Sequence, residues 1–404
     1  MIEGTARDLK VAYVVPRYGV EVLGGAELGA RMLAEHLVEH IGCSVEVFTT
    51  CAREMSTWAD EYPAGSVDVN GVTVHRFGVA AGRDPGFDRL SDQVLGRPAE
   101  VSPADGEHWI DMQGPVCPAA LDAAEASAAG VVVFYPYLYW PTVHGVRRLG
   151  ERAVLHPATH DEPPTRLPLF QEVYSRPGGL VFQTHGERRL TERLFPGSAR
   201  RPQAVVGLGV EESDGDPAAA AGALGLGDRP YLLCLGRVDD GKGALLLARY
   251  FAAYKLRRPG PLALVFAGPV IDRPADHPDI VVAGAVDEDV KWGALRGATA
   301  LVSASPNESF SLALLEGWAA GVPALVNGAC EATATHARRS GGGMWFTGYG
   351  TFEGAVDRLV GDGKLRSAMA EAGRQYVDRL YRWPRLIGRY ADFLTSVAAR
   401  RPLH

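Results

Sequence analysis

Apolar runs and amphipathic stretches alternate in a regular order at the start of the chain. Residues 10–15 form a short apolar run, a loop with Gly24 and Gly25 follows, and residues 26–40 carry apolar side chains at helical spacing. A second apolar run, residues 44–50, comes directly afterwards. Strand, glycine loop, helix and strand in this order predict a βαβ unit, with the loop at the carboxyl ends of parallel strands. The pattern therefore favours a doubly wound α/β sheet.

The same alternation continues in two blocks that are separated by a change in composition. Further strands of the first block are predicted at residues 72–77, 130–135, 153–155, 180–184 and 203–206. Residues 80–118 are polar, contain proline and glycine and show little periodicity, so we expect an insertion with short helices. Residues 211–228 are acidic and then rich in alanine and glycine, which is typical of an interdomain linker.

The second block repeats the βα order after this linker. Its strands are predicted at residues 231–235, 262–267, 280–283, 299–303 and 323–326, and two helices at residues 244–254 and 311–320. Residues 352–399 are predicted to be helical, with a break near residue 383. We therefore predict an α/β protein with two Rossmann-like, doubly wound domains, residues 1–210 and 229–382. They are expected to face each other across a cleft, which is the default ligand site in such folds.

Composition excludes several classes of protein. The 404 residues are 47% hydrophobic and 22% charged, which is typical of a globular chain and not of a disordered or fibrous one. The most apolar stretch, residues 131–140, has about half the length that a bilayer requires. The N-terminus does not resemble a secretory signal, so we expect a cytoplasmic protein with at most peripheral membrane contact. Five cysteines without a CxxC pair fit a reducing compartment, and a net charge of −7 without a basic cluster indicates no nucleic-acid partner.

Two cations lie in one short turn of the second block. Lysine is rare, and the chain has only Lys10, Lys242, Lys255, Lys291 and Lys364. Arg237 and Lys242 are five positions apart between a predicted strand and a predicted helix, where one anionic group can be clamped by both. The alternative is a surface turn with solvated cations, which the rarity of lysine makes less attractive.

Two carboxylates follow a later strand. Glu308 lies in a loop, and Glu316 lies on the next predicted helix, whose first turn is expected near residues 309–311. Both carboxylates can border one pocket, and the free N–H groups and positive dipole end of that helix start favour a phosphate. The spacing alone equally allows a solvated helix residue and an ordinary loop carboxylate.

Together these segments resemble the retaining GT-B glycosyltransferases of family 4, in the order and spacing of that family. The resemblance covers essentially the whole chain and is carried by Gly24-Gly25-Ala26-Glu27, Gly236-Arg237, Lys242-Gly243, and Glu308 with Glu316. Stretches 14–18, 160–164 and 325–328 are similar to a bacterial subgroup associated with surface polysaccharide or related glycan assembly. The resemblance implies the GT-B fold, with an acceptor-side domain, a nucleotide-sugar donor-side domain, and a C-terminal helix, residues 383–404, against the N-terminal domain.

The resemblance also implies a role for each site residue. Arg237 and Lys242 would neutralise the diphosphate of a nucleotide-sugar donor. Glu316 would bind the ribose, Glu308 would bind the donor hexose, and His160 would contact the donor sugar near the reacting carbon. The other donor-side residues that it implies are Gly24, Gly25, Val286, Ser309, Phe310, Ser311 and Leu312. Many members carry glycines in place of Ser309 and Ser311, so a bulkier loop and a different donor-sugar pocket are expected.

Aromatic residues and histidines raise two further possibilities in the first block. Tyr137 and Tyr139 alternate after a predicted buried strand and can stack on an acceptor sugar, with Asp161 as a further acceptor residue, although core packing is the commoner explanation for such tyrosines. His156 and His160 are four positions apart, but the nearby prolines argue against a helix, so no metal site is expected there.

These roles predict an enzyme that moves a hexose from a nucleotide diphosphate sugar to a hydroxyl acceptor, a glycan or a small glycoside, with retention at the anomeric carbon. The leaving diphosphate would take the acceptor proton, and neither a cofactor nor a metal ion is expected. Two alternatives keep the fold. One is a sugar phosphorylase or a nucleotide-sugar epimerase, and the other is a non-catalytic subunit that binds a nucleotide sugar.

Overall fold

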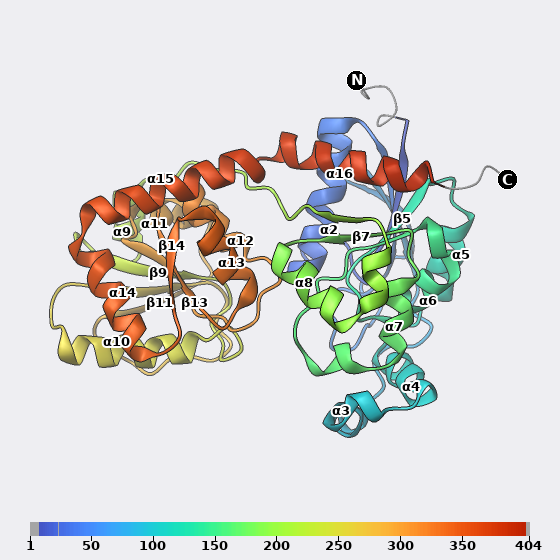
Figure 1. Cartoon of the computed structure of the whole chain (residues 1–404), viewed down its shortest axis with the longest axis horizontal. Coiled ribbons are helices and arrows are strands. Elements are labelled where there is room, and N and C mark those ends of the chain that lie inside the picture. The colour runs from blue at the N-terminus through green and yellow to red at the C-terminus, as the bar shows by residue number, and fades with distance from the viewer. Residues whose placement is uncertain (1–7, 23, 401–404) are drawn as a thin grey trace. The chain divides into compact units, whose positions relative to one another are not determined.

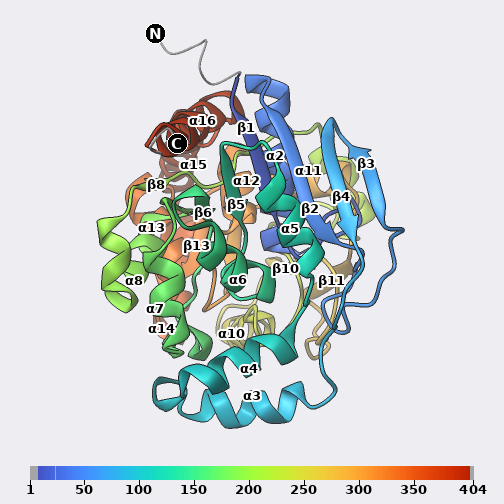
Figure 2. The same ribbon diagram turned by 90° about the vertical axis from the view of Figure 1, so that its right-hand side faces the viewer.

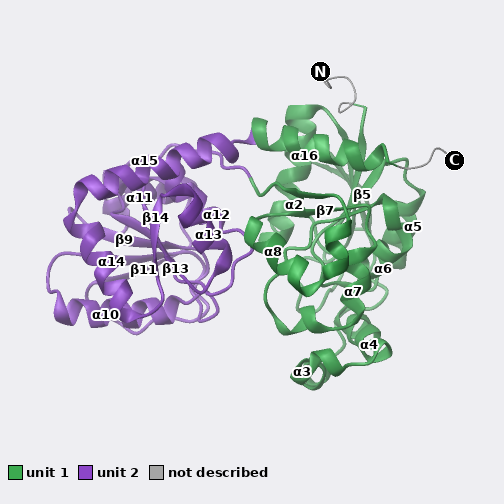
Figure 3. Cartoon of the chain, in the orientation of Figure 1, with its two compact units in different colours: residues 1–208, 384–404 green, residues 209–383 purple. Residues whose placement is uncertain are grey.

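The computed structural model describes residues 8–22 and 24–400, and the chain divides into two compact units (Figure 3). The first unit comprises residues 1–208 and 384–404, and the second comprises residues 209–383. Each unit has its own sheet with helices packed against it, as Figure 1 shows.

The first unit contains an eight-stranded sheet in the order β3-β4-β2-β1-β5-β6-β7-β8. Its strands are β1 (Lys10–Val14), β2 (Ser44–Thr50), β3 (Gly65–Val69), β4 (Val72–Phe77), β5 (Val131–Phe134), β6 (Ala153–Leu155), β7 (Gly179–Phe182) and β8 (Gln203–Val205). All neighbours pair in parallel except β3 and β4, which form an antiparallel hairpin at the edge. The strand β3 was not predicted, because its side chains are mostly exposed and show no apolar alternation. The Asn70-Gly71 turn, with φ of 53° and 82°, is the signal that marks this hairpin.

The second unit contains a six-stranded, fully parallel sheet in the order β11-β10-β9-β12-β13-β14. Its strands are β9 (Tyr231–Leu235), β10 (Ala263–Ala267), β11 (Ile280–Gly284), β12 (Ala300–Ser303), β13 (Ala324–Asn327) and β14 (Gly343–Phe346). Numbered from its first strand, this order is the doubly wound order of Rossmann-like folds. The prediction of two doubly wound α/β sheets is confirmed.

Helices connect the strands in both units. Those of the first unit are α2 (Gly25–His36), α3 (Phe87–Gly96), α4 (Pro103–Gln113), α5 (Pro118–Ala126), α6 (Trp140–Leu149), α7 (Leu169–Ser175) and α8 (His185–Leu194). Those of the second unit are α9 (Pro217–Ala223), α10 (Ala244–Arg257), α11 (Glu288–Gly297), α12 (Leu312–Ala319), α13 (Glu331–Ser340), α14 (Tyr349–Gly361) and α15 (Gly363–Leu380). The helix predicted at residues 26–40 ends earlier, because a π-helical turn over Leu37–Ile41 follows α2.

The prediction of a linker at residues 211–228 is wrong. This segment lies in the second unit and contains α9, which packs against α11. The two helices approach so closely that a Cβ atom on Gly293 would lie 2.5 Å from the carbonyl oxygen of Asp216 and 2.8 Å from Cβ of Ala220. The alanine- and glycine-rich composition therefore serves close helix packing, and Asp216 caps α9 by accepting a hydrogen bond from Ala219 N–H at 2.7 Å.

The last helix, α16 (Trp383–Ala398), follows α15 after a short break and, from Pro384 onward, contributes to the first unit. The hydroxyl groups of Tyr390 on α16 and Tyr13 on β1 are hydrogen-bonded at 3.0 Å, and both side chains are buried. Gly179 makes room for this helix, because a Cβ atom there would lie 2.9 Å from the side chains of Phe393 and Val397. The C-terminal helix is thus part of the core of the first unit.

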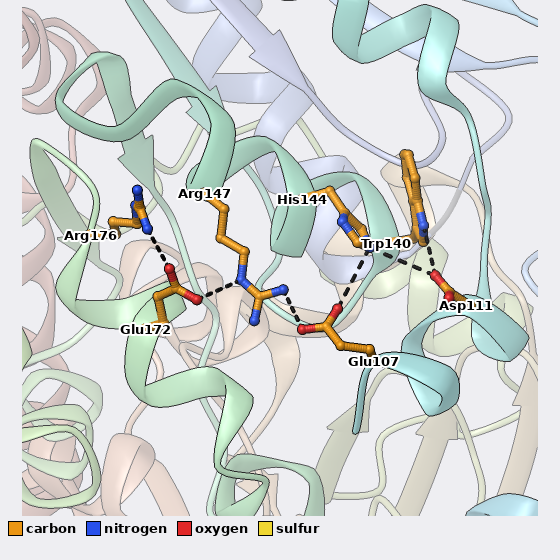
Figure 4. Close-up of polar contacts among 7 residues, drawn as sticks. All are labelled: Glu107, Asp111, Trp140, His144, Arg147, Glu172 and Arg176. Atoms are coloured by element: carbon orange, nitrogen blue, oxygen red, sulfur yellow. Dashed lines mark hydrogen bonds and ion pairs between the residues drawn. The ribbon is translucent and has the colours of Figure 1, made fainter. Parts of the chain in front are cut away.

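The expected insertion at residues 80–118 contains α3 and α4, which lie side by side at the lower end of Figure 2. A polar network ties α4 to α6 and α7 (Figure 4). Arg147 of α6 donates a hydrogen bond to Glu107 of α4, and its Nε lies 3.0 Å from Oε2 of Glu172 on α7. Nε1 of Trp140 donates to Asp111 of α4 at 3.1 Å. The insertion is therefore anchored to the helices beside β5 and β6.

Candidate active site

The strand order reverses between β9 and β12, and the loops that follow these two strands form the candidate site of the second unit. The loop after β9 carries Arg237 and ends at Gly243, which has a φ of 72°. A Cβ atom at Gly243 would lie only 2.4 Å from the carbonyl oxygen of Ala304, directly after β12. Only glycine allows this approach, which brings Lys242 next to the loop after β12.

Lys242 and Glu308 form the central contact of this site. Nζ of Lys242 lies 2.8 Å from Oε1 of Glu308, and both side chains are partly buried. Asp239 supports both predicted cations: its Oδ1 accepts a hydrogen bond from Lys242 N–H at 2.7 Å, and its Oδ2 accepts one from Nε of Arg237 at 2.9 Å. Asp239 is itself buried, and the sequence analysis did not assign it a role.

These residues line a cavity of about 170 Å³. Its polar lining includes Arg237, Lys242, Ser305, Glu308 and Ser311. The ammonium of Lys242 has three N–H donors, and the Arg237 side chain is more than half exposed, so both cations can still bind an anion in the cavity. The structure thus brings together the two cations and one of the two carboxylates that the sequence singled out.

The start of α12 differs from the prediction. The helix begins at Leu312 and not within residues 309–311, because Ser311 adopts a left-handed conformation with a φ of 73°. This conformation favours glycine, which agrees with the glycines that the related family carries here. Phe310 turns into the core, where its ring lies 5.5 Å from His336 and 5.7 Å from Tyr381. The Phe310 side chain is therefore structural, whereas Ser309 stays partly exposed in the loop and Leu312 lines the cavity.

Glu316 lies on α12 and pairs with a lysine of α11. Its Oε1 is 3.1 Å from Nζ of Lys291, and only 14% of the Glu316 side chain is exposed. Burial raises the pKa of the Glu316 carboxyl, although Lys291 opposes this effect. Burial alone would lower the pKa of Lys291, but Glu316 and Glu288 outweigh it and raise that pKa. Lys291 was not assigned a role, although the rarity of lysine was a signal for it, and Val286 lies just before α11 in a half-buried position.

In the first unit, Gly24 stands at the start of α2 against a buried ion pair. Nε of Arg17 donates to Oε1 of Glu27 at 3.0 Å, and the two side chains are only 8% and 7% exposed. A Cβ atom at Gly24 would lie 2.0 Å from Oε2 of Glu27, whereas one at Gly25 would meet no other heavy atom within 4 Å. Gly24 is therefore required by this ion pair, and Gly25 is the glycine that leaves open space beside the loop.

Two of the three expected acceptor residues are committed to other contacts. Tyr137 is buried, its ring lies 4.9 Å from that of Phe170, and its hydroxyl donates to Glu162 at 2.7 Å, so the stacking role is wrong for this residue. Asp161 is exposed and hydrogen-bonded to Arg166. Tyr139 is only half-buried and lies edge-on to Trp58.

The two histidines of the first unit occupy different environments. His156 is buried, stacks on Tyr135 at 4.9 Å, and burial lowers its pKa to about 3. It is therefore a neutral core residue. His160 lies half-buried in the loop after β6 and shares no described metal cluster with His156.

A buried carboxylate holds the loop that carries His160. Oε1 of Glu187, at the start of α8, accepts a hydrogen bond from Thr159 N–H at 2.9 Å, and Oε2 accepts one from Gln183 N–H at 2.6 Å. Burial raises the pKa of Glu187 to about 7, although these backbone N–H groups oppose the effect. Glu187 joins the ends of β6 and β7 and positions the residue next to His160. Glu187 stands three residues after Thr184, which caps the helix, and this spacing is the sequence signal that could have singled out Glu187.

Comparison with known proteins shows what this chain resembles. Residues 229–365 match the family model of group 1 glycosyl transferases. The fold matches that of a sucrose-phosphate synthase from Thermosynechococcus elongatus, with a TM-score of 0.71 and 16% identity over 97% of this chain and 100% of the other. The chain has the GT-B fold, and its second unit carries a match to the group 1 glycosyl transferases.

Curated relatives of this chain are named as mannosyl- and glycosyltransferases. A GDP-mannose-dependent α-(1-6)-phosphatidylinositol monomannoside mannosyltransferase from Mycobacterium tuberculosis is 28% identical over 58% of this chain and 67% of the relative. A D-inositol 3-phosphate glycosyltransferase from Frankia alni is 27% identical over 77% of this chain and 83% of the relative. Among residues 8–22 and 24–400, no helix is both long and apolar enough to cross a bilayer.

Proposed function

We propose that this glycosyltransferase transfers a hexose from a nucleotide diphosphate sugar to a hydroxyl group of a carbohydrate acceptor, with retention at the anomeric carbon. The observation that carries the proposal is the cavity between the loops after β9 and β12, whose lining includes Arg237, Lys242 and Glu308. A pair of cations beside a carboxylate suits a ligand that joins a diphosphate to a polyhydroxyl ring. The names of the relatives, which include a GDP-mannose-dependent transferase, support a donor of this class.

Each charged group of the cavity has a task in this reaction. The planar guanidinium of Arg237 binds two phosphate oxygens, and Lys242, held at 2.8 Å by Glu308, provides a point charge beside them. Glu308 binds hydroxyl groups of the hexose. Glu316, fixed by Lys291, binds the ribose from the side of α12. The developing negative charge on the leaving diphosphate is thereby stabilised by groups that are already in place.

The proposed reaction exchanges one bond at the anomeric carbon for another on the same face. The bond between that carbon and the diphosphate oxygen breaks, and the electron pair leaves with the nucleoside diphosphate. A bond to the acceptor oxygen forms, and the acceptor proton moves to the departing phosphate. His160, whose loop is held by Glu187, is proposed to contact the sugar near the reacting carbon.

Product stereochemistry tests this proposal. The full chain is incubated with a panel of uridine, guanosine and adenosine diphosphate sugars and with sugar acceptors, and the anomeric coupling of the product is followed by proton NMR. We expect one base to be used far better than the others and the product to keep the anomeric configuration of the donor. A product of opposite configuration, or turnover that requires inorganic phosphate and no nucleotide, would contradict the proposal.

The proposal includes metal-independent transfer, because two cations, Arg237 and Lys242, and the first residues of α12 line the cavity proposed to bind the diphosphate. Turnover is expected to persist after treatment with EDTA. Loss of turnover in EDTA, with recovery in magnesium or manganese, would show that a metal ion stabilises the leaving group.

A further inference from the structure

Three potential metal ligands lie within five residues at the C-terminal end of α2. They are His36, Glu39 and His40, and one ligand atom from each lies within 4.8 Å of the other two. Nδ1 of His36 is 3.1 Å from Oε2 of Glu39, and Nε2 of His40 is 3.8 Å from the same oxygen. The cluster is at the opposite end of α2 from Gly24 and Gly25, so it does not belong to the candidate active site.

The backbone at this cluster is a π-helical turn, Leu37–Ile41. The N–H group of Gly42 bonds to the carbonyl of Leu37, five residues earlier, at 3.1 Å. A π turn is wider than an α turn and is rare, and such turns often occur at functional sites. The rings of His36 and His40 are stacked, parallel within 2° and with centroids 5.1 Å apart. Both imidazoles therefore lie on the same side of the helix, and one ring has to turn before both can direct a nitrogen at one ion.

The three side chains differ in exposure in a way that suits ion binding. His36 is 9% exposed and is held by the core, whereas His40 is 27% and Glu39 is 63% exposed, so an ion can enter from solvent. The carbonyl groups at the end of the helix also favour a cation.

We propose that His36, Glu39 and His40 form a binding site for a divalent transition-metal ion, with zinc(II) as the best match. Zinc binds imidazole nitrogen and carboxylate oxygen at about 2.0–2.2 Å in a tetrahedron, which places ligand atoms about 3.3–3.5 Å apart. The distances of 3.1 and 3.8 Å to the Glu39 oxygen lie close to this spacing, and water can take the fourth position. Magnesium and calcium prefer oxygen ligands and fit less well.

The proposed ion would act on stability and not on glycosyl transfer. Three ligands within five residues would tie His36, the last residue of α2, to the π-helical turn, and an ion that binds only the folded chain stabilises it. The inference does not depend on the proposed function, because its ligands and its readouts are separate from the cavity of the second unit.

The test uses the full chain after removal of bound metal. Calorimetric titration with zinc(II) is expected to show one equivalent bound, and cobalt(II) is expected to give the visible absorption of a tetrahedral site. The variants His40→Gln and Glu39→Gln change partly exposed side chains and should fold. Each is expected to weaken zinc binding at least about tenfold, the loss found even for supporting residues of metal sites.

His75→Gln is the matched control, because Nε2 of His75 also lies near a carboxylate, 3.3 Å from Glu46, and no second histidine joins this pair among the described clusters. This variant should bind zinc like the wild type. Zinc should raise the melting temperature of the wild type and of His75→Gln but not of the two ligand variants. Absence of zinc binding, binding that His40→Gln and Glu39→Gln leave unchanged, or an equal loss in His75→Gln would overturn the proposal.

Discussion

The two sheets have related strand orders, but the loops at their reversal points are filled differently. Between β9 and β12 the loops leave a cavity of about 170 Å³, whose wall includes the partly exposed Lys242 and Glu308. At the reversal between β1 and β5 lie the buried pair of Arg17, in the loop after β1, and Glu27, on α2, together with the buried ring of Tyr135. The same edge of a doubly wound sheet thus carries a partly exposed ion pair beside a cavity in one unit and a buried ion pair in the other.

This difference has an energetic reason. A partly exposed ion pair contributes little to stability, so Lys242 can exchange its contact with Glu308 for one with a phosphate at small cost. A fully buried pair cannot lose a partner without leaving an unpaired charge in the core. The second unit is therefore suited to bind and release an anion, whereas Arg17 and Glu27 hold the Gly24 loop in one position. The predictions below test this contrast.

The largest expected effect is on stability in the first unit. Arg17→Met leaves the Glu27 carboxylate buried and unpaired, and we expect it to lower the free energy of unfolding by about 3–5 kcal/mol in urea. Arg148→Met, which removes an exposed pair with Asp122, is the control and should cost less than about 1 kcal/mol. Equal losses in the two variants would remove the contrast between the units.

The next effect is on catalysis in the second unit. Lys242→Ala and Arg237→Ala are each expected to lower kcat/KM by about 10²–10³, because a charge that stabilises the leaving group is removed. Arg237→Lys should recover only part of this loss, since the planar fork is absent. Lys364→Ala, on the exposed start of α15, should have wild-type kinetics. Steady-state rates at varied donor concentration decide the matter, and wild-type rates in both alanine variants would exclude these residues from the diphosphate site.

A third prediction concerns the buried carboxylate of the first unit. Burial raises the pKa of Glu187 from 4.5 to about 7, so the folded state holds this proton more tightly than the unfolded state does. The stability from this group is fully present below the unfolded pKa and is lost as pH rises through the folded value, by about 1.4 kcal/mol per unit. Glu187→Gln removes this dependence. Urea unfolding at about pH 5 and about pH 8 should show a smaller difference in the variant than in the wild type. An unchanged difference would mean that Glu187 is ionised throughout this range.

The smallest effect separates the two glutamates of the second unit. Glu316→Gln should weaken nucleotide binding about tenfold and change kcat little, because ribose contacts are alike in the ground and transition states. Glu308→Gln should lower kcat about tenfold with little loss of nucleotide affinity, because Glu308 lies beside the reacting sugar. Calorimetry with nucleoside diphosphates and steady-state kinetics measure both. Equal losses of affinity with unchanged kcat would show that another group binds the sugar.

Much of the fold could be predicted because strands and helices leave a local pattern. β1, β2 and β9 are apolar runs bounded by polar loops, and their bounds lie within one residue of the prediction. The helix α9 could not be predicted in this way, because its alanines and glycines are also typical of a linker. The close approach of Gly293 on α11 to Ala220 explains why α9 has small residues.

The residues of the candidate site likewise include some that the sequence predicted and some that it did not. Charge and glycine content in a short turn pointed to Arg237 and Lys242. Asp239, which supports the two cations, and Lys291, which pairs with Glu316, could not be predicted, because their partners come from packing and hydrogen bonds that the local pattern does not reveal. Tyr137 was assigned to an acceptor sugar, but its ring is buried against Phe170.

The sequence by itself determined the two-sheet α/β architecture and the turn that carries Arg237 and Lys242, because periodicity and turn chemistry act over a few residues. Only the tertiary structure decided which side chains meet. Gly243 is only part of a short motif in the sequence, but its contact with Ala304 is what sets Lys242 beside Glu308, 66 positions later. Likewise, only the structure shows that the nitrogens of His36 and His40 both lie within 4 Å of one oxygen of Glu39, at a π-helical turn. Contacts of this kind depend on backbone geometry and burial, which follow from the packing of the whole unit and not from the neighbouring residues.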